Sequence, residues 1–414
     1  MSMIRKSLLQ FIFSGSFMKR WNDKLRPLEL LEVDKQAHKM ITAWVLYHLN
    51  SRSMSEKDSV QLGREIVEGG IFEYLYRLVI TDIKPPIFYK IKDNPLHYQQ
   101  LTEWVLEQLE PRIHALGNNF WEKLVAYVQE PYGHSQARQI LEASHLFASQ
   151  WEFRLIKDLN SWDDEMMDIE RNFQDSLRDY RELQGITMLS SDSCDHIRCF
   201  LDKCGQLRFQ KRWSQTPRIP ETSVLGHMFI VACYAYFLSL AVEASPLQAQ
   251  NNFFAGLFHD LPELLTRDII SPVKHSVQRI GALIKEYEES EFSEKILGLL
   301  KSGGSMGLAE RLLYFLGGQG GCEFDCTIRQ GEKTFQVGRE QLQETYNYDC
   351  YDGKDGHLLK VCDSLAAFIE AYTAMKNGIT TDQLQQAVWR IRSDYNQVYL
   401  GKELHIGSLL ADFD

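Results

Sequence analysis

Apolar residues recur at spacings of three and four along most of the chain, the pattern of helices that bury one face. Residues 101–116 (LTEWVLEQLEPRIHAL) and 363–378 (DSLAAFIEAYTAMKNG) show it clearly, and Gly378 is a typical stop signal for the second segment. The charged residues 168–184 are expected to form a helix near the middle of the chain. The pattern predicts an all-α fold.

One segment departs from the helical pattern. In residues 322–338 (CEFDCTIRQGEKTFQVG), Phe324, Cys326 and Ile328 alternate with polar residues before the sequence RQGE, and a second alternating run follows. Alternation with a period of two is typical of half-buried strands. We therefore expect a small β-hairpin inserted among the helices.

The chain also contains an internal repeat. Residues 70–86 (GIFEYLYRLVITDIKPP) and 256–272 (GLFHDLPELLTRDIISP) share seven of seventeen positions without a gap, where average composition would give roughly one. The triplet KRW occurs at 19–21 and again at 211–213. Matches in the same order along the chain indicate a duplication.

Two further matches extend the repeat. The apolar runs that begin at His38 and His227 share His, Ile, Ala, Tyr and Leu in register. More weakly, the run from Ile140 can be laid over the run from Leu358, which places His145 opposite Asp363. Because 414 residues also exceed what one hydrophobic core usually supports, we predict two tandem domains, residues 1–185 and 186–414.

Bulk properties exclude some classes of partner. A net charge of -11 argues against a broad basic surface for polymeric DNA or RNA, although small anionic substrates remain compatible. No apolar run of 18 residues is evident, so we expect no membrane span.

Eight cysteines without a CxxC pair are typical of reduced thiols in the cytoplasm. Residues 1–17 mimic a short signal peptide, but the MKRW that follows belongs to the repeat, so we expect them in the fold.

The second copy holds the residues best suited to chemistry. His227 opens one apolar segment, His259 and Asp260 end another, and Asp363 lies inside a third. An unpaired carboxylate in an apolar helix would be costly to bury. A divalent metal that gathers two imidazoles and two carboxylates removes that cost, and such a ligand set suits Mn, Fe, Co, Ni or Zn better than Mg or Ca. The alternative, that each residue has only a capping or surface role, is reasonable for each residue alone but not for the set.

These residues resemble the signature of the HD-domain metal-dependent phosphohydrolases, H…HD…D contributed by separate helices. Within that superfamily the sequence is most similar to the 5′-nucleotidases that act on deoxyribonucleoside monophosphates, through KRW, ETSVLGH, HDLPELLTRDIISPVKH and KVCDSLAAFIEA. The resemblance implies one divalent transition metal per chain, held by His227, His259, Asp260 and Asp363. The metal would lower the pKa of a bound water.

The resemblance also implies roles for the residues around the metal. Glu263, four residues after His259, would share catalysis with Asp260 by moving a proton between water and the leaving 5′-oxygen. Arg212 would bind phosphate oxygens, while Trp213 would pack against the sugar and donate its indole N–H.

The resemblance also implies substrate-binding roles for three residues whose own chemistry supports the role less strongly. Asp268 would take the 3′-hydroxyl, although its repeat partner Asp82 favours a structural role, and Lys211 and Lys274 are further candidates for substrate binding. Gly226 departs from the nucleotidase pattern, in which an acidic residue often precedes the first histidine.

The first copy is expected to be degenerate. It offers His38, Glu73, Tyr74 and His145 at the metal positions, and Arg77 replaces the proton-transfer residue. A cation at that place would repel a metal. Because single-domain members of the resembling family commonly form homodimers, the tandem chain is expected to pack as an internal pseudo-dimer, with further dimerisation of whole chains left open.

The sequence therefore favours a cytoplasmic phosphohydrolase of (deoxy)nucleotides with a 5′-nucleotidase-like activity. Two alternatives stay open, hydrolysis of nucleoside triphosphates or alarmone-like nucleotides, and a non-catalytic nucleotide sensor or scaffold.

Overall fold

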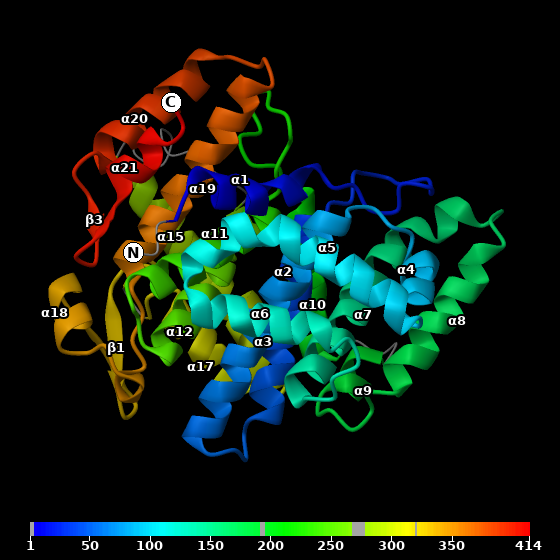
Figure 1. Ribbon diagram of the computed structural model, residues 1–414. Coiled ribbons are helices and arrows are strands. Elements are labelled where there is room, and N and C mark those ends of the chain that lie inside the picture. Colours follow the sequence, from blue (N-terminus) through cyan, green and yellow to red (C-terminus); the bar gives the residue numbers. More distant parts are fainter. Residues whose placement is uncertain (1–3, 191–194, 267–277, 319–320) are drawn as a thin grey trace.

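The computed structural model describes residues 4–190, 195–266, 278–318 and 321–414 (Figure 1). Helices account for 69% of it and strands for 4%, which confirms the predicted all-α fold. The helices and strands are α1 (Lys6–Phe13), α2 (Glu32–Asn50), α3 (Glu56–Ile80), α4 (Pro85–Lys92), α5 (Pro95–Ile113), α6 (Asn118–Gln129), α7 (Gln136–Ile156), α8 (Glu165–Arg178), α9 (Ile186–Ser190), α10 (His196–Gln206), α11 (Val224–Ala241), α12 (Pro246–Phe258), α13 (Glu263–Thr266), α15 (Gln278–Phe292), α16 (Gly298–Ser302), α17 (Met306–Phe315), β1 (Thr327–Gln330), β2 (Lys333–Gln336), α18 (Arg339–Glu344), α19 (Gly356–Lys376), α20 (Asp382–Tyr395), β3 (Tyr399–Leu400), β4 (Leu404–His405) and α21 (Ile406–Ala411).

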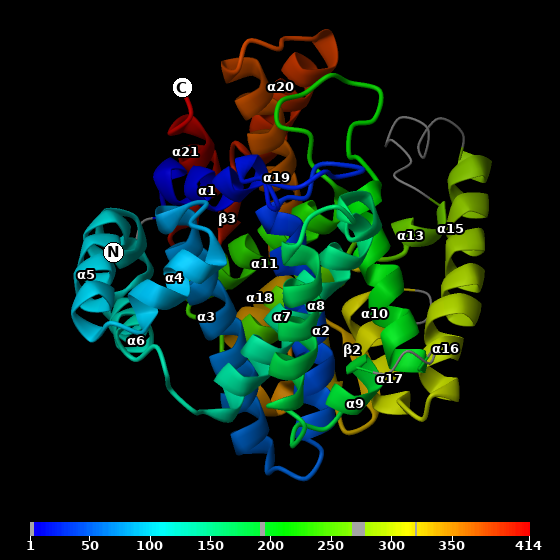
Figure 2. The same cartoon turned by 90° about the vertical axis from the view of Figure 1, so that its right-hand side faces the viewer.

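Helices α2 and α11 lie at the centre of the molecule, and one hydrophobic core runs through both halves of the chain (Figures 1 and 2). Helix α11 packs against α12, α2 and α19. Among the described helices, α11 is long and apolar enough to cross a membrane by length and composition alone, and 89% of it is buried inside the protein. The expectation that no such run exists is therefore wrong for residues 224–241, and burial identifies the run as a core helix.

The start of the chain belongs to this core. Leu8, Leu9, Ile12 and Phe13 of α1 are buried, and the hydroxyl of Tyr234 in α11 donates to the carbonyl of Leu9 at 2.8 Å. For residues 4–17, the part of this segment that the structure describes, these contacts agree with the expectation that it belongs to the fold.

Helix ends follow local sequence signals. Ser223 precedes α11, and its hydroxyl accepts the N–H of Gly226 at 2.9 Å, which satisfies a backbone donor that the helix leaves free. Asp355 caps α19 in the same way by accepting the N–H of Leu358 at 2.9 Å. Gly378 lies just beyond α19 with a φ of 88°, a left-handed conformation that favours glycine. The predicted stop is confirmed.

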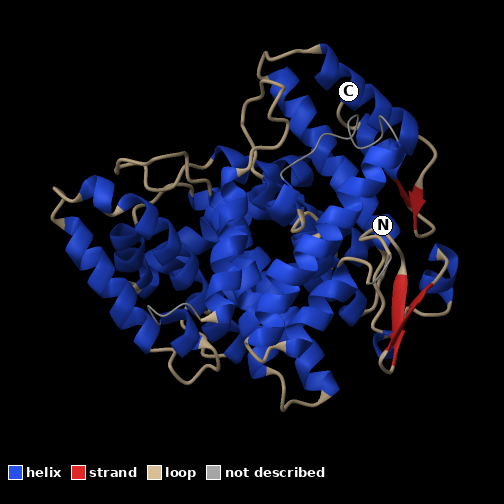
Figure 3. Ribbon diagram, turned by 180° about the vertical axis from the view of Figure 1, so that it is seen from behind, coloured by secondary structure: helices blue, strands red, loops and turns tan. Residues whose placement is uncertain are grey.

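The predicted hairpin is also confirmed. Strands β1 and β2 pair antiparallel, with Thr327 opposite Gln336 and Gln330 opposite Lys333, and they lie at the edge of the helical body (Figure 3). The paired strands begin at Thr327, after the start of the alternating pattern. A second two-stranded ribbon, β3 with β4, was not predicted.

The two KRW segments adopt one geometry. Lys19 forms an isolated bridge with Leu31, and Lys211 forms the corresponding bridge with Ser223. The tryptophan that ends each segment has positive φ, 55° at Trp21 and 57° at Trp213. All these pairs are separated by 192 positions, so the backbone matches residue for residue up to the first turns of α2 and α11.

The tryptophans and arginines of these segments also bind equivalent carboxylates. Trp21 donates its indole N–H to Glu152 at 3.1 Å, as Trp213 does to Glu370 at 2.8 Å. The preceding arginines, Arg20 and Arg212, form ion pairs with the same two carboxylates. Glu152 and Glu370 are thus structurally equivalent, in agreement with the alignment of the run from Ile140 with the run from Leu358.

This geometry corrects the placement of His38. A separation of 192 places Lys35, not His38, opposite His227. Lys35 Nζ lies 2.7 Å from His145 Nδ1, just as His227 faces Asp363. His38 instead contacts the carbonyl of Leu201 at 3.0 Å.

The prediction for the cysteines is only partly correct. Cys199 is disulfide-bonded, which contradicts the expectation that every thiol is reduced. The free cysteines among the described residues are Cys204, Cys233, Cys322, Cys326, Cys350 and Cys362. Cys194 lies outside the described residues.

Candidate metal centre

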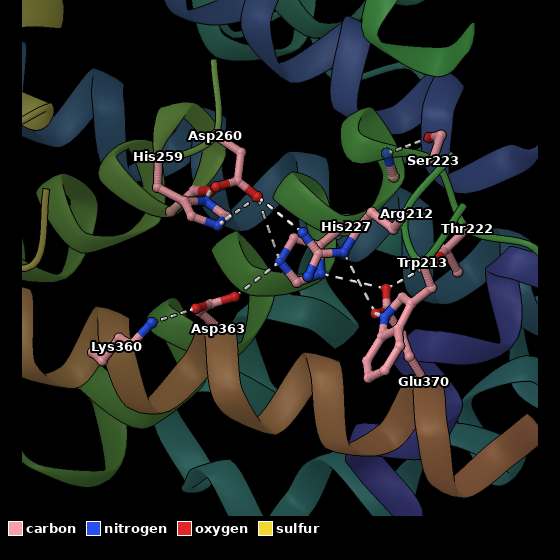
Figure 4. A network of polar contacts seen from close by, with 12 residues as sticks. Arg212, Trp213, Thr222, Ser223, His227, His259, Asp260, Lys360, Asp363 and Glu370 are labelled. Atoms are coloured by element: carbon pink, nitrogen blue, oxygen red, sulfur yellow. Dashed lines mark hydrogen bonds and ion pairs between the residues drawn. The ribbon is translucent and has the colours of Figure 1, made fainter. Parts of the chain in front are cut away.

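Three helices bring the predicted metal ligands together (Figure 4). His227 lies in the first turn of α11, His259 and Asp260 directly follow α12, and Asp363 lies in the second turn of α19. His227, His259 and Asp363 each offer a ligand atom within 4.8 Å of the others. The sequence placed these residues far apart, and the fold gathers them at one point.

The separations between the donor atoms fit a shared ion. His227 Nε2 lies 3.2 Å from Asp363 Oδ1, and His259 Nε2 lies 3.2 Å from Asp260 Oδ2. Ligands about 2.1 Å from one ion, at angles between 90° and the tetrahedral value, are roughly 3.0–3.4 Å apart. The distance from His227 Nε2 to Asp260 Oδ2, 3.8 Å, is slightly longer. The residues present therefore fit a divalent ion with nitrogen and oxygen ligands.

The two histidines present suitable nitrogens. His259 directs Nδ1 to the carbonyl of Gly256 at 2.8 Å, so Nδ1 carries a proton and Nε2 is the nitrogen that faces the site. This Nε2 is buried and makes no hydrogen bond with the described residues, although Asp260 is close. Because Asp260 favours a second proton on this ring, an ion would bind Nε2 by displacing that proton.

Gly256 also sets the distance between the two histidine helices. A Cβ at this position would lie 3.0 Å from Ala232 Cα and 3.1 Å from Ala232 N, so only glycine allows α12 to approach α11 this closely. The imidazole rings of His227 and His259 consequently lie 5.4 Å apart between centroids.

The charges of the site hold each other in place. Burial lowers the pKa of His259, but the neighbouring Asp260 outweighs burial and raises it to about 8. Burial favours the protonated form of Asp260, yet His259 and Arg212 hold its pKa well below the usual range. For Asp363 burial is likewise outweighed, by His227 and Lys360, and its pKa also lies well below the usual range. Both carboxylates are therefore ionised at neutral pH.

Glu370 is a buried hub that the sequence reading did not assign to the site. It accepts hydrogen bonds from Trp213 at 2.8 Å and from the hydroxyl of Thr222 at 2.9 Å. Its Oε1 also faces His227 Nδ1 at 3.4 Å. Burial opposes its ionisation, but Arg212 and other cations keep its pKa well below the usual range. A carboxylate behind a metal-binding histidine fixes the orientation of the ring.

Arg212 and Trp213 lie at the site, in contacts the sequence did not predict. The guanidinium of Arg212 donates Nη1 to Asp260 at 3.2 Å and approaches Glu370 with Nε at 3.5 Å. The indole N–H of Trp213, expected to serve a substrate, is already donated to Glu370. The expected sugar contact through this N–H therefore does not fit the structure.

Glu263 lies in the cavity that adjoins the metal centre. This cavity of about 300 Å³ is lined by His259, Asp260 and Glu263, among other residues. Glu263 is 8% exposed and begins the short helix α13. Glu263 thus lines the same cavity as His259 and Asp260, and its role in proton transfer stays a prediction.

The other predicted substrate residues lie apart from this cavity or outside the described chain. Lys211 is partly exposed and pairs with Glu221 at 3.7 Å. Asp268 and Lys274 lie outside the described residues. Lys360, which the sequence did not single out, donates to Asp363 Oδ2 at 3.0 Å.

The first half of the chain reaches the first turn of α11. The hydroxyl of Ser223 donates to Asp34 at 2.5 Å while it caps the helix that carries His227. A Cβ at Gly226 would lie 2.7 Å from Asp34 Oδ1. Gly226, noted as a departure from the nucleotidase pattern, thus makes room for a carboxylate from the other half.

Comparison with known families supports this site at the level of the domain. Residues 204–392 match the family model of the HD domain, and this span includes all four predicted ligands. HD domains are typical of metal-dependent phosphohydrolases, so the match supports that superfamily for this part of the chain. No curated protein matches the chain, and no solved structure matches it.

Proposed function

We propose that the second half, residues 186–414, is a metal-dependent phosphomonoesterase that acts on (deoxy)nucleoside 5′-monophosphates. The observation that carries the proposal is the convergence of His227, His259 and Asp363, whose ligand atoms lie within 4.8 Å of one another, with Asp260 3.2 Å from His259 Nε2 and 3.8 Å from His227 Nε2. His227, His259, Asp260 and Asp363 would hold Mn, Co, Fe, Ni or Zn. The ion, when bound, would lower the pKa of a water so that it can attack phosphorus at neutral pH.

The residues around the centre would position the phosphate and move the proton. Arg212 uses Nη1 and Nε in its contacts with Asp260 and Glu370, which leaves Nη2 directed by neither contact and suited to a phosphate oxygen. Glu263, in the cavity beside His259, would accept a proton from the attacking water and return it to the leaving 5′-oxygen. Lys211, Asp268 and Lys274 stay candidates for substrate binding.

The charge of the cavity makes phosphate binding depend on the metal. Five carboxylates line the cavity against one lysine, Lys301; they belong to Asp260, Glu263, Glu288, Glu289 and Glu323. A dianionic phosphate would be repelled from such a surface without a compensating cation. We therefore expect nucleoside monophosphate binding to be lost when the metal is removed with a chelator.

Phosphate release from nucleoside mono-, di- and triphosphates, measured with added Mn or Co, tests the proposal. Asp260→Ala should abolish both metal binding and release, while Glu73→Ala, at the position of the first half that aligns with His259, should retain both. Release from triphosphates alone would favour the alternative hydrolase. Nucleotide binding without release in any metal would contradict the enzymatic proposal and favour a sensor.

We also propose that the halves arose by duplication and that the first is a non-catalytic partner packed as an internal pseudo-dimer. The support is the separation of 192 positions between the matching bridges of the two KRW segments, together with the core that both halves share. Residues 186–414 alone would expose α11 along its contact with α2. A fragment of residues 186–414 that is monomeric, as stable as the whole chain and fully active would overturn this proposal.

A further inference from the structure

A half-exposed lysine lies beside the metal centre and has no part in the reaction proposed above. Lys360 stands one turn before Asp363 in α19, and its Nζ donates to Asp363 Oδ2 at 3.0 Å. The other oxygen of this carboxylate, Oδ1, faces His227 Nε2 at 3.2 Å. The side chain of Lys360 is 50% exposed. Its ammonium group is therefore open to solvent and separated from the ligand cluster by a single carboxylate.

Each carboxylate of the predicted ligand set is paired with one cation of the chain. Asp260 accepts from Arg212 at 3.2 Å, as Asp363 does from Lys360, and Figure 4 shows the two cations on opposite sides of the ligands. Arg212 is 13% exposed and is also held by Glu370. Within the described chain, Lys360 forms an ion pair with Asp363 alone. Lys360 is thus the more accessible and the less firmly held of the two cations.

The segment that leads into the hairpin lies next to this lysine. Lys360 Nζ lies 4.4 Å from the centroid of the Phe324 ring, within the range of a cation–π contact. The same ring lies 6.3 Å from the ring of His259, and the preceding residue, Glu323, lines the cavity beside His259. The segment therefore runs along the edge of that cavity, with Lys360 against it.

Backbone contacts fix this segment against the start of α19. Lys354 Nζ donates to the carbonyl of Glu323 at 2.9 Å. A Cβ at Gly356, the first residue of α19, would lie 2.2 Å from the carbonyl carbon of Phe324, so a glycine is needed where the two backbones cross. The insertion thus holds the ring of Phe324 beside the helix that carries Lys360 and Asp363.

We propose that Lys360 is a substrate-binding residue whose ammonium group binds a phosphate oxygen at the metal centre. Lysine carries three donors on a flexible stem, and the contact with Asp363 uses one of them. With a divalent ion bound at Asp260 and Asp363, part of the negative charge that holds Lys360 is neutralised, and a dianionic phosphate becomes its stronger partner. This inference rests on the proposed function and assigns a residue to the phosphate of its substrate.

Calorimetric titration of inorganic phosphate into the full chain with bound Mn tests the inference without turnover. Lys360→Gln removes a charged donor from a half-exposed place and should weaken phosphate binding about five- to tenfold. Lys360→Arg keeps the charge and should stay within a factor of about three of wild type. Mn affinity, measured by competition with a chelator, should not fall in Lys360→Gln, because the lysine and the ion compete for Asp363. A purely structural role would lower Mn affinity as well.

Lys376→Gln is the matched control on the same helix. Lys376 is exposed and also lies over an aromatic ring, 5.3 Å from the centroid of Tyr372. Because an α-helix rises about 1.5 Å per residue, it stands roughly 24 Å along α19 from Lys360, and its loss should leave phosphate affinity unchanged.

Three results would overturn the proposal: equal phosphate affinity in wild type and Lys360→Gln, equal losses in Lys360→Gln and Lys376→Gln, or no phosphate binding by the Mn-loaded wild type. Failure of the proposed function is seen separately, as absence of phosphate release from every nucleotide. Release from nucleoside monophosphates together with unchanged phosphate affinity in Lys360→Gln would reject the role of Lys360 alone.

Discussion

Replacement of Glu370 by glutamine tests whether the buried hub serves the metal centre. The change keeps the shape of the side chain but removes the negative charge that faces Arg212. The new amide N–H₂ is a donor, and it would face another donor, either the indole N–H of Trp213 or the hydroxyl of Thr222. Breaking a buried ionic network in this way costs about 3–5 kcal/mol. Because Glu370 also orients His227 at 3.4 Å, metal affinity should fall by about 10- to 100-fold.

Glu152→Gln is the matched control in the first half. Glu152 is as buried as Glu370 and accepts from Arg20, Trp21 and Arg208, so its loss should lower the free energy of unfolding by a similar amount. It does not contact the metal centre, and metal affinity should stay within a factor of about two.

Urea denaturation and competition with a chromophoric chelator measure the two effects separately on the same preparations. Wild-type metal affinity in Glu370→Gln would refute the assigned role of Glu370. An equal loss of metal affinity in Glu152→Gln would show that general destabilisation, not the orientation of His227, controls the site.

Three further predictions concern the first half of the chain, two of them its contact with the second half. Gly226→Ala should lower stability by about 1–3 kcal/mol in urea denaturation, because its Cβ would lie 2.7 Å from Asp34 Oδ1 and 2.8 Å from Val33 Cγ2; wild-type stability of this variant would contradict the clash. Burial raises the pKa of Asp34 from 3.8 to about 6, so the folded state holds a proton that the unfolded chain releases, and the free energy of unfolding should fall as pH rises through that window. Asp34→Asn should remove this decline, and an unchanged pH slope would refute the assignment. Elemental analysis should find one metal ion per chain, since Lys35 Nζ lies 2.7 Å from His145 Nδ1 where the first half would need its ion; two ions per chain would disprove it.

Much of the architecture could be predicted because local sequence determines it. Helical periodicity gave α5 and α19, and alternation gave the hairpin of β1 and β2. The metal residues were recognisable because imidazole and carboxylate groups are out of place in otherwise apolar helices. Glu370 carried the same signal, since it lies seven residues after Asp363 on the same face of α19, but no motif drew attention to it.

The register of the first repeat could not be obtained from apolar patterns. Alignment of the two histidines gives a separation of 189, whereas the backbone contacts give 192. The difference of three residues is close to one helical turn, so both registers place apolar residues on the same face. Only the contacts made before the helix begins, such as those of Lys19 and Lys211, distinguish them. The role of Asp34 was equally hidden, because it depends on contact between segments far apart in sequence.

If the two halves are copies, as proposed above, the register of 192 positions explains how the first half keeps its fold without a metal. A buried arrangement of acidic groups is stable only when cations compensate it. In the second half, the cation would be a divalent ion bound by the predicted ligands. In the first half, lysine side chains lie at the corresponding place. Lys35 lies beside His145 and 4.0 Å from Glu32, and Lys39 contacts Glu73. Amines of the chain thus stand where the ion would be. The first half can then keep the surface that α11 packs against, and the carboxylate of Asp34 that Ser223 contacts, without depending on metal supply.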